Sequence, residues 1–200
     1  HAVRKREPGK RALDGFLALG HMTHPYTVPY RVMVPRRIDG LLVPVAASAT
    51  HLGLGTLRME PCWMAMGQAA GVAAHLAVRG NREVRGVDIG QLQRALLDSG
   101  QVLVHYRDLT GKEPWFKAVQ YCGAHGFFTN WQAEPMAPVL RAEAVAWFEK
   151  LHRKIRDRGR PFETLDWAVL QEWLGRELPK GRHPYVLRHE FASVLYESGL

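Results

Sequence analysis

The chain has 200 residues, 46% of them hydrophobic, and its 27 Lys and Arg against 19 Asp and Glu give a formal net charge of +8. This length and apolar content suit one or two domains with a hydrophobic core. No apolar run free of glycine and charge reaches the length of a membrane span, and no signal peptide is visible. Because the chain begins with His1 rather than Met, we expect it to be the C-terminal part of a longer protein.

The basic residues are spread along the chain, with clusters at residues 4–6, 10–11, 36–37 and 150–160. Such clusters occur in nucleic-acid or anionic-surface patches and also on solvated helix faces and tails. The second interpretation is favoured because no aromatic-rich binding motif accompanies them, so no nucleic-acid partner is expected. Cys62 and Cys122 lack metal-ligand spacing and leave the compartment open.

The beginning of the chain shows no clear periodicity. Residues 1–24 are basic and contain Pro8-Gly9, so we predict a linker or the remnant of a preceding domain, with a short strand at residues 15–22. His21 and His24 raise the alternative of a metal pair. Two loop histidines without a third ligand at fixed spacing are more often surface residues, and no metal is expected.

The best-defined pattern begins at residue 26. Residues 26–35 alternate and contain two prolines, which predicts an extended edge or crossover segment. Residues 40–46 are a continuous apolar run, which predicts a central strand covered on both faces, and residues 48–56 are a polar, glycine-bearing turn. A strand, a turn and a long helix together predict an α/β domain at residues 25–106.

The long helix is predicted from Pro61 to the pair Gly80-Asn81, with Glu60 as its cap. It carries almost no charge before His75, so we expect burial nearly all round. Small residues at positions 67, 70, 71 and 74 form one face, which would let a neighbouring backbone or a flat ligand approach closely.

Helical spacing dominates the remainder of the chain. Asp88 is the predicted cap of a helix at residues 89–97, which is followed by a brief strand or extended end at residues 102–104. Further helices are predicted at residues 114–124, 140–152, 164–174 and 187–196. Residues 107–200 are therefore predicted to form a small all-α C-terminal domain.

Several linked motifs occur in order between residues 25 and 105. They are Tyr-Thr-Val-Pro-Tyr-Arg at 26–31, Ser-Ala-Thr-His at 48–51, Thr-Leu-Arg-Met-Glu-Pro at 56–61 and Gly-Gln-Ala-Ala-Gly-Val-Ala-Ala at 67–74. The segment resembles the C-terminal flavin-contacting part of bacterial FAD-dependent oxidoreductases of the two-dinucleotide-binding-domain flavoprotein superfamily. The resemblance implies FAD as cofactor and an α/β fold that is the C-terminal portion of a Rossmann-like FAD-binding domain.

The resemblance also implies where the flavin would lie. A helix N-terminus stabilises an anion, and in flavoproteins that look like this one it points at the N1/C2=O edge of the flavin. Carried over residue by residue, the cofactor contacts fall on Ser48, Thr50, Arg58, Met59, Glu60, Cys62 and Trp63. Cys62 and Trp63 are the expected backbone donors because Pro61 has no N–H.

Catalytic and substrate-facing residues follow from the same resemblance. His51 is the candidate polar group over the ring and a proton carrier, with a hydrogen-bonded structural histidine as the alternative. Arg58 would add a charge or bind substrate, with an ion pair to Glu60 as the alternative. Tyr30 and Arg31 would face the substrate cavity, although core packing of Tyr30 is equally compatible with the pattern.

The intact enzyme would move a hydride between a small-molecule substrate and the flavin. The segment Gly53-Leu54-Gly55 lacks the third glycine of a dinucleotide fingerprint. The adenine and ribose contacts are therefore expected on a missing N-terminal FAD-binding half, and this piece alone is expected to be inactive.

A second resemblance covers the C-terminal part. Trp-Phe-Lys-Ala-Val-Gln-Tyr at 115–121, Gly-Phe-Phe at 126–128 and Pro-Val-Leu-Arg-Ala-Glu-Ala at 138–144 resemble a surface-layer-homology repeat, with a partial echo at residues 187–192. The repeat usually has threonine where Leu140 stands. This resemblance implies an alternative function, a non-catalytic cell-wall or glycan-binding module at residues 107–200. A docked helical appendage without a ligand competes with it. An extracytoplasmic location is favoured, and a cytoplasmic one stays open.

Overall fold

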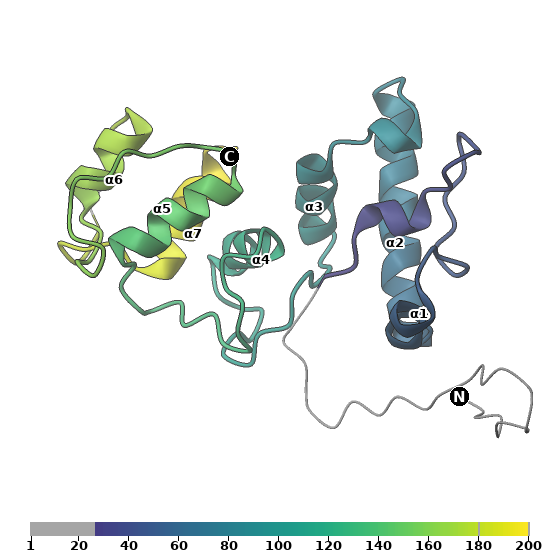
Figure 1. Ribbon diagram of the computed structural model, residues 1–200, viewed down its shortest axis with the longest axis horizontal. Helices are drawn as coiled ribbons and strands as arrows, with labels where there is room; N and C mark the ends of the chain where they lie inside the picture. Colours follow the sequence, from purple (N-terminus) through teal and green to yellow (C-terminus); the bar gives the residue numbers. More distant parts are fainter. Residues whose placement is uncertain (1–26, 180, 200) are drawn as a thin grey trace, which may run out of the picture.

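A computed structural model describes residues 27–179 and 181–199, whose regular structure is helical (Figure 1). The first group of elements is η1 (Tyr30–Met33), α1 (His51–Leu57), α2 (Glu60–Arg79), η2 (Val84–Gly86) and α3 (Ile89–Asp98). The second group is α4 (Phe116–Ala124), α5 (Arg141–Lys150), α6 (Trp167–Leu174) and α7 (Arg188–Glu197). The predicted strand at residues 15–22 and the pair His21 and His24 lie outside the described residues.

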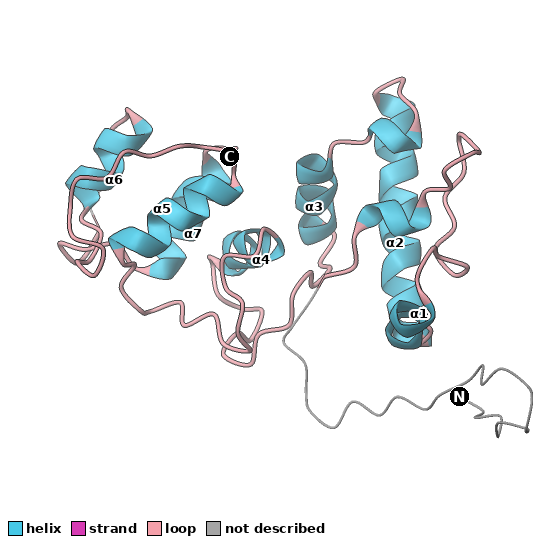
Figure 2. Ribbon diagram, in the orientation of Figure 1, coloured by secondary structure: helices cyan, strands magenta, loops and turns pink. Residues whose placement is uncertain are grey.

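The predicted α/β fold, with a Rossmann-like portion, is wrong for the described residues, which contain isolated bridges but no sheet (Figure 2). Residues 40–46 form a loop that is joined to η1 through the Val43 N–H, which donates to the Met33 carbonyl at 2.8 Å. A strand must pair its backbone groups with a neighbouring strand, and none lies beside this loop in the part of the chain that the structure describes. The apolar run alone therefore does not make a strand.

Residues 51–57 form helix α1, where the sequence predicted a turn over residues 48–56. The Thr50 side chain accepts a hydrogen bond from the Gly53 N–H at 3.1 Å and so caps the helix. A capping threonine satisfies one of the free N–H groups of the first turn, which offsets part of the cost of two glycines in so short a helix. The helix ends at Leu57, and the N–H of its C-cap Arg58 donates to the Leu54 carbonyl.

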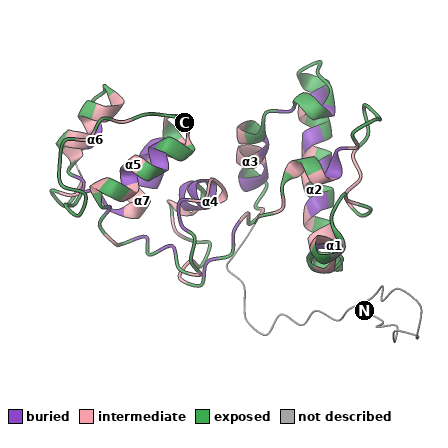
Figure 3. Ribbon diagram, viewed as in Figure 1, coloured by how far each residue is buried: buried purple, intermediate pink, exposed green. Residues whose placement is uncertain are grey.

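Helix α2 follows the predicted boundaries closely, but its burial differs from the prediction. It runs from Glu60 to Arg79 with Gly80 as its C-cap, and its N-cap is Met59, so the prediction of Glu60 as the cap is wrong. Its inner face, which includes Met66 and Ala73, is buried, whereas its outer face is exposed (Figure 3). The expectation that α2 is buried on all sides is therefore wrong. A low charge content occurs in fully buried helices and also in helices whose apolar face stays exposed, so it does not tell the two apart.

Helix α3 connects the two groups of helices. Asp88 Oδ1 accepts from the Gln91 N–H at 2.9 Å, which confirms the predicted cap. The Arg94 guanidinium lies over the rings of both Tyr121 and Tyr196, 4.5 and 4.4 Å from their centroids. Helix α3 thus packs against α2 on one side and α4 on the other, with α4 in turn packed on α7 (Figure 1).

Residues 102–104 form no strand, and Leu103 and Val104 lie in a bend that a side chain holds. Gln120, which is 1% exposed, accepts from the N–H groups of Leu103 and Val104 at 2.9 and 2.8 Å. Its amide donates in return to the Val104 carbonyl at 2.7 Å. Gln120 therefore satisfies the backbone of the connection between α3 and α4, as a neighbouring strand would.

Three helix starts in the C-terminal part are joined in a closed ring of backbone hydrogen bonds. The Val139 N–H donates to the Val186 carbonyl, the Val186 N–H to the Leu165 carbonyl, and the Leu165 N–H to the Val139 carbonyl, at 2.9, 2.8 and 2.7 Å. Each residue lies two positions before the first residue of α5, α6 or α7 and is fully buried. The three segments are thus equivalent in the fold, although only two of them resemble the repeat in sequence.

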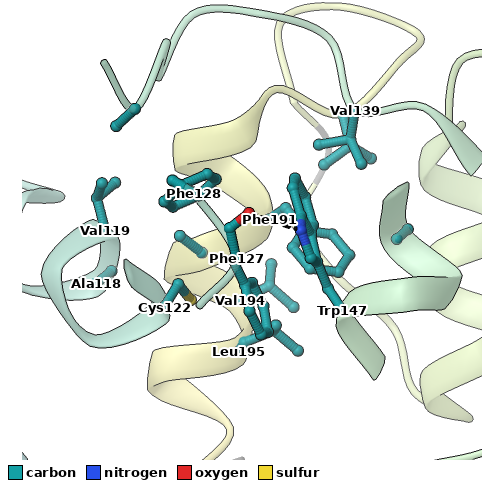
Figure 4. Packing of buried hydrophobic residues seen from close by; sticks show 14 of the residues in the cluster. Ala118, Val119, Cys122, Phe127, Phe128, Val139, Trp147, Phe191, Val194 and Leu195 are labelled. Carbon is teal, nitrogen blue, oxygen red and sulfur yellow. Dashed lines mark hydrogen bonds between the residues drawn. The ribbon is translucent and has the colours of Figure 1, made fainter. Parts of the chain in front are cut away.

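Aromatic side chains fill the core beneath this ring (Figure 4). The Trp147 ring stacks on Phe127 and lies 5.4 Å from Phe191, centroid to centroid, and the Trp147 indole N–H donates to the Phe127 carbonyl at 3.0 Å. Phe148 and Phe191 are both fully buried and meet edge to face. This core extends from Val104 to Leu195 and includes Cys122, which is a free thiol, as is Cys62.

Candidate functional site

The junction of α1 and α2 carries most of the residues predicted to contact a cofactor. Arg58, Met59 and Glu60 are exposed there, between the end of α1 and the first turn of α2. The Arg58 side chain forms no ion pair and no hydrogen bond within the described residues, so the alternative of a pair with Glu60 is not what the structure shows. Arg58 therefore presents an uncompensated positive charge beside a helix N-terminus.

The first turn of α2 leaves backbone donors free. Met59 makes no side-chain cap, and Pro61 has no N–H to donate. The Trp63 N–H donates to the Met59 carbonyl at 3.1 Å, so this predicted donor is already engaged. The N–H groups of Glu60 and Cys62 remain, and they carry the partial positive charge of the helix end.

Cys62 and Trp63 also contribute side chains at this end of the helix. The Cys62 thiol is half-buried and lies 3.7 Å from the Met66 sulfur, and burial raises its pKa, so the thiol stays protonated near neutral pH. The Trp63 indole Nε1 is buried and has no hydrogen-bond partner among the described residues. A buried donor without a partner is costly, so this indole N–H is an unsatisfied group at the start of α2. The sequence analysis named Trp63 as a backbone donor and did not identify its indole N–H.

The predicted site residues at the start of α1 have fewer free polar groups with which to contact a cofactor. The Ser48 N–H donates to the Val32 carbonyl at 2.7 Å, and the Ser48 side chain is exposed. The Thr50 hydroxyl is used as the helix cap. His51 is the first residue of α1, and its side chain lies outside what the structure describes.

Tyr30 and Arg31 lie in η1, apart from the junction of α1 and α2 in sequence. The Tyr30 hydroxyl donates to the Val84 carbonyl at 2.8 Å, and its ring packs against both small hydrophobic clusters of the N-terminal part. Burial raises the pKa of this hydroxyl. Tyr30 therefore ties η1 to η2, in agreement with the packing alternative, while Arg31 is exposed.

The outer face of α2 is accessible along its length. A Cβ added at Gly67 or Gly71 would meet no atom within 4 Å, and Ala74 is exposed on the same face. Met64 is 76% exposed and Val78 is 82% exposed. Of the predicted small-residue face, only Ala70 is buried.

These groups together suit the polar edge of a ligand that carries or gains negative charge. A cation, two free backbone N–H groups and an unpartnered indole N–H all donate, and a helix N-terminus favours an anion. The residues present therefore fit the pyrimidine edge of a flavin. No cluster of metal-ligating side chains occurs among the described residues, and no described helix is long and apolar enough to cross a membrane.

Comparison with protein families identifies this part of the chain. Residues 14–96 match the model of the family described as FAD dependent oxidoreductase. Searches of curated proteins and of solved structures gave no significant match. The matched range contains η1, α1, α2, η2 and most of α3, and therefore every predicted site residue. Residues 14–96 are an FAD-dependent oxidoreductase region, with FAD as the indicated cofactor.

Proposed function

We propose that the junction of α1 and α2 provides the pyrimidine-side contacts of FAD in an oxidoreductase of the two-dinucleotide-binding-domain superfamily. The observation that carries the proposal is the unpaired Arg58 beside the uncapped start of α2, within the matched range. When bound, FAD would supply hydride transfer at its N5 atom. The protein would supply binding, orientation and a local positive potential.

Each residue has a distinct role in this proposal. Arg58 and the N–H groups of Glu60 and Cys62 would donate to the N1/C2=O edge, where negative charge develops on reduction. The Trp63 indole N–H would donate to a polar atom of the ligand. His51, at the first position of α1, is proposed as the proton carrier, and Arg31 as a substrate-facing residue.

The outer face of α2 supports a further element of the proposal, a partner that completes the site. Met64 and Val78 are large apolar side chains in water, and the glycines between them leave room for close approach. Exposed apolar surface of this kind marks an interaction site. We propose that the N-terminal FAD-binding half, which would carry the adenine and ribose contacts, covers this face, and that residues 25–106 alone are inactive.

The first test is the intact mass of the native protein, measured with a visible spectrum of the same sample. Flavin absorption bands in a species much heavier than 22.6 kDa are expected. A colourless species of 22.6 kDa would contradict the proposal.

The second test addresses Arg58 in that native protein. Arg58→Gln removes the charge, so the two-electron reduction potential of the flavin should fall by about 30–60 mV, from the loss of about 1.5–3 kcal/mol of charge-assisted hydrogen bonding. Arg58→Lys should restore most of the potential. Arg79→Gln, at the opposite end of α2, is the matched control and should leave it unchanged. An equal potential in Arg58→Gln and wild type would remove Arg58 from the flavin site.

The ring of three equivalent helix starts favours a second candidate function for residues 107–200. Three linked helix starts are what a surface-layer-homology-like arrangement would give, with one repeat each at Val139, Leu165 and Val186. Such a unit would act as a non-catalytic cell-wall or glycan-binding module. Pull-down of the full chain by purified cell-wall glycan tests this function, and recovery no greater than on unmodified beads would leave the helical appendage without a ligand.

A further inference from the structure

The connection between α5 and α6 holds the densest charge in the chain. Residues 150–160, which we call the basic loop, contain six Lys and Arg and a single carboxylate: Lys150, Arg153, Lys154, Arg156, Asp157, Arg158 and Arg160. This leaves +5 in eleven residues of a chain whose net charge is +8. The loop lies outside the FAD-dependent oxidoreductase region and takes no part in the proposed flavin site.

The one carboxylate of the basic loop is already occupied. Arg141, at the start of α5, forms an ion pair with Asp157, and both side chains are shielded, at 13% and 12% exposure. The Gly159 N–H also donates to Asp157 Oδ1 at 3.0 Å. Asp157 is therefore used to fasten the loop to α5 and does not neutralise the exposed cations.

Four of those cations are free. Arg153, Lys154, Arg156 and Arg158 are exposed, and none forms an ion pair within the described residues. The two remaining cations are less available, because Lys150 donates to the Gly126 carbonyl and Arg160 lies 3.9 Å from a Glu163 oxygen. The free charges lie consecutively at residues 153–158 with only Ile155 and Asp157 between them.

The backbone that carries these cations is anchored to the C-terminal core and to α5. Leu151 and Ile155 pack against the C-terminal core, and the Arg153 N–H donates to the Phe148 carbonyl at 2.9 Å. At the other end, the Ala142 N–H donates to the Pro161 carbonyl at 3.1 Å. The basic loop thus runs along α5 and is anchored at both of its ends.

A large apolar side chain follows the charges directly. Phe162 is 72% exposed, although it lies only two residues after Arg160 and next to the anchored Pro161. The exposed ring of Phe162 would lose apolar contact with water if a partner covered it. Cations beside one exposed aromatic side chain are the combination that binds anionic membrane surfaces, where charge attracts phosphate and the ring enters the interface.

We propose that the basic loop and Phe162 form a docking surface for an anionic phospholipid membrane. The free cations would contact lipid phosphates, with the Arg side chains bonding phosphate oxygens in pairs. Phe162 would lie at the level of the headgroups. A nucleic acid would use the charges but not Phe162, since a single ring gives no stacking platform for successive bases.

The test is co-sedimentation of the full chain with vesicles. Binding is expected on vesicles of equal parts phosphatidylcholine and phosphatidylglycerol, and not on phosphatidylcholine alone. Because each surface cation contributes about a fivefold factor, Arg153→Gln with Arg156→Gln should weaken binding about 25-fold. Phe162→Ser should weaken binding severalfold, and Phe162→Leu should retain most of it. The double variant Arg36→Gln and Arg37→Gln, with the same charge loss elsewhere, should bind as wild type does.

Several outcomes would overturn the proposal. One is equal binding to neutral and anionic vesicles, and another is a loss in the Arg36→Gln and Arg37→Gln control as large as that in the basic loop. Duplex DNA at the same phosphate concentration is tested as a third ligand, beside the two kinds of vesicle. If the DNA binds the chain, the basic-loop variant weakens that binding and Phe162→Ser changes neither ligand, then the surface recognises nucleic acid and not a membrane. Circular dichroism of each variant shows that the helices are intact.

Discussion

The two parts of this molecule differ in how completely they bury their own apolar side chains. From Val104 to Leu195 the chain builds one continuous core of twenty buried residues, many of them aromatic. Between residues 28 and 103 the described chain has only two small clusters of six and three buried residues. The C-terminal part is therefore held by a larger core of its own than the described N-terminal part, which is the contrast expected if, as proposed above, the N-terminal part is completed by a partner.

The exposed apolar residues show the same contrast. Most of the large exposed hydrophobic residues of the described chain lie between Ile38 and Val78, within the range 14–96 that the flavin-enzyme family match covers. In the C-terminal part such residues are few, and Phe162 adjoins the basic loop. This distribution is what we expect if the first part contacts a partner and Phe162 belongs to the proposed docking surface.

The largest effect is expected from emptying the C-terminal core. Phe191→Ala removes a fully buried ring that lies against Trp147 and Phe148, so the free energy of unfolding should fall by about 3–5 kcal/mol. Met66→Ala, in the three-residue cluster under α2, should cost about 2 kcal/mol, because its surroundings are open enough to rearrange. Denaturant unfolding of the full chain measures both. Equal losses would mean that the two parts are packed equally well.

A smaller loss is expected at the connection between the two parts. Gln120→Leu leaves the N–H groups of Leu103 and Val104 and the Val104 carbonyl buried without partners, at a cost of about 2–4 kcal/mol. Gln171→Leu breaks a single bond to the Leu178 carbonyl and should cost about 1 kcal/mol. Thermal unfolding followed by circular dichroism compares them. Similar melting temperatures for the two variants would show that Gln120 does not organise the connection.

Local signals in the sequence located several elements correctly. Pro61 and Gly80 define the ends of α2 to within a residue, and Asp88 caps α3, because caps and breakers act over one turn of chain. The exposed turn Arg58–Glu60 precedes a helix whose first N–H groups are free, and its role as a cofactor site stays a prediction. These features depend on neighbours in sequence.

Features that depend on distant residues were not predictable. Residues 40–46 have the composition of a strand, but a strand exists only with a partner, and the described chain supplies none. The ring of bonds among Val139, Leu165 and Val186 joins positions more than twenty residues apart. Helix α1 was missed for another reason, because Gly53 and Gly55 favoured a turn and Thr50 was not recognised as a helix cap.

A weaker, pH-dependent effect is expected at the loop before α4. Glu113 accepts from the N–H groups of Thr110 and Gly111, and these bonds lower its pKa from 4.5 to about 2. Because the folded pKa lies below the unfolded one, the carboxylate stabilises the fold above about pH 4.5, and this contribution is lost as the pH falls toward 2. The contribution should stay below about 1 kcal/mol because water screens the group.

Glu113→Gln isolates this contribution. The stability difference between wild type and variant, measured by urea unfolding across the acid range, should shrink steadily on acidification. A difference that stays constant with pH would show that the carboxylate charge is not involved.

The smallest effect on stability, and the sharpest test of the comparison, is expected on the outer face of α2. Met64→Ser combined with Val78→Ser replaces two exposed apolar side chains, so each change should alter the free energy of unfolding by at most about 0.5 kcal/mol. Ala73→Ser, on the fully buried inner face, is the matched control and should cost about 1–3 kcal/mol through an unsatisfied hydroxyl. If the outer face is a contact surface, the double variant should also reduce self-association of the isolated chain in sedimentation velocity. A large loss of stability in the double variant would mean that Met64 and Val78 stabilise α2 within this chain. The contrast between a self-contained C-terminal part and an incomplete N-terminal part would then not hold.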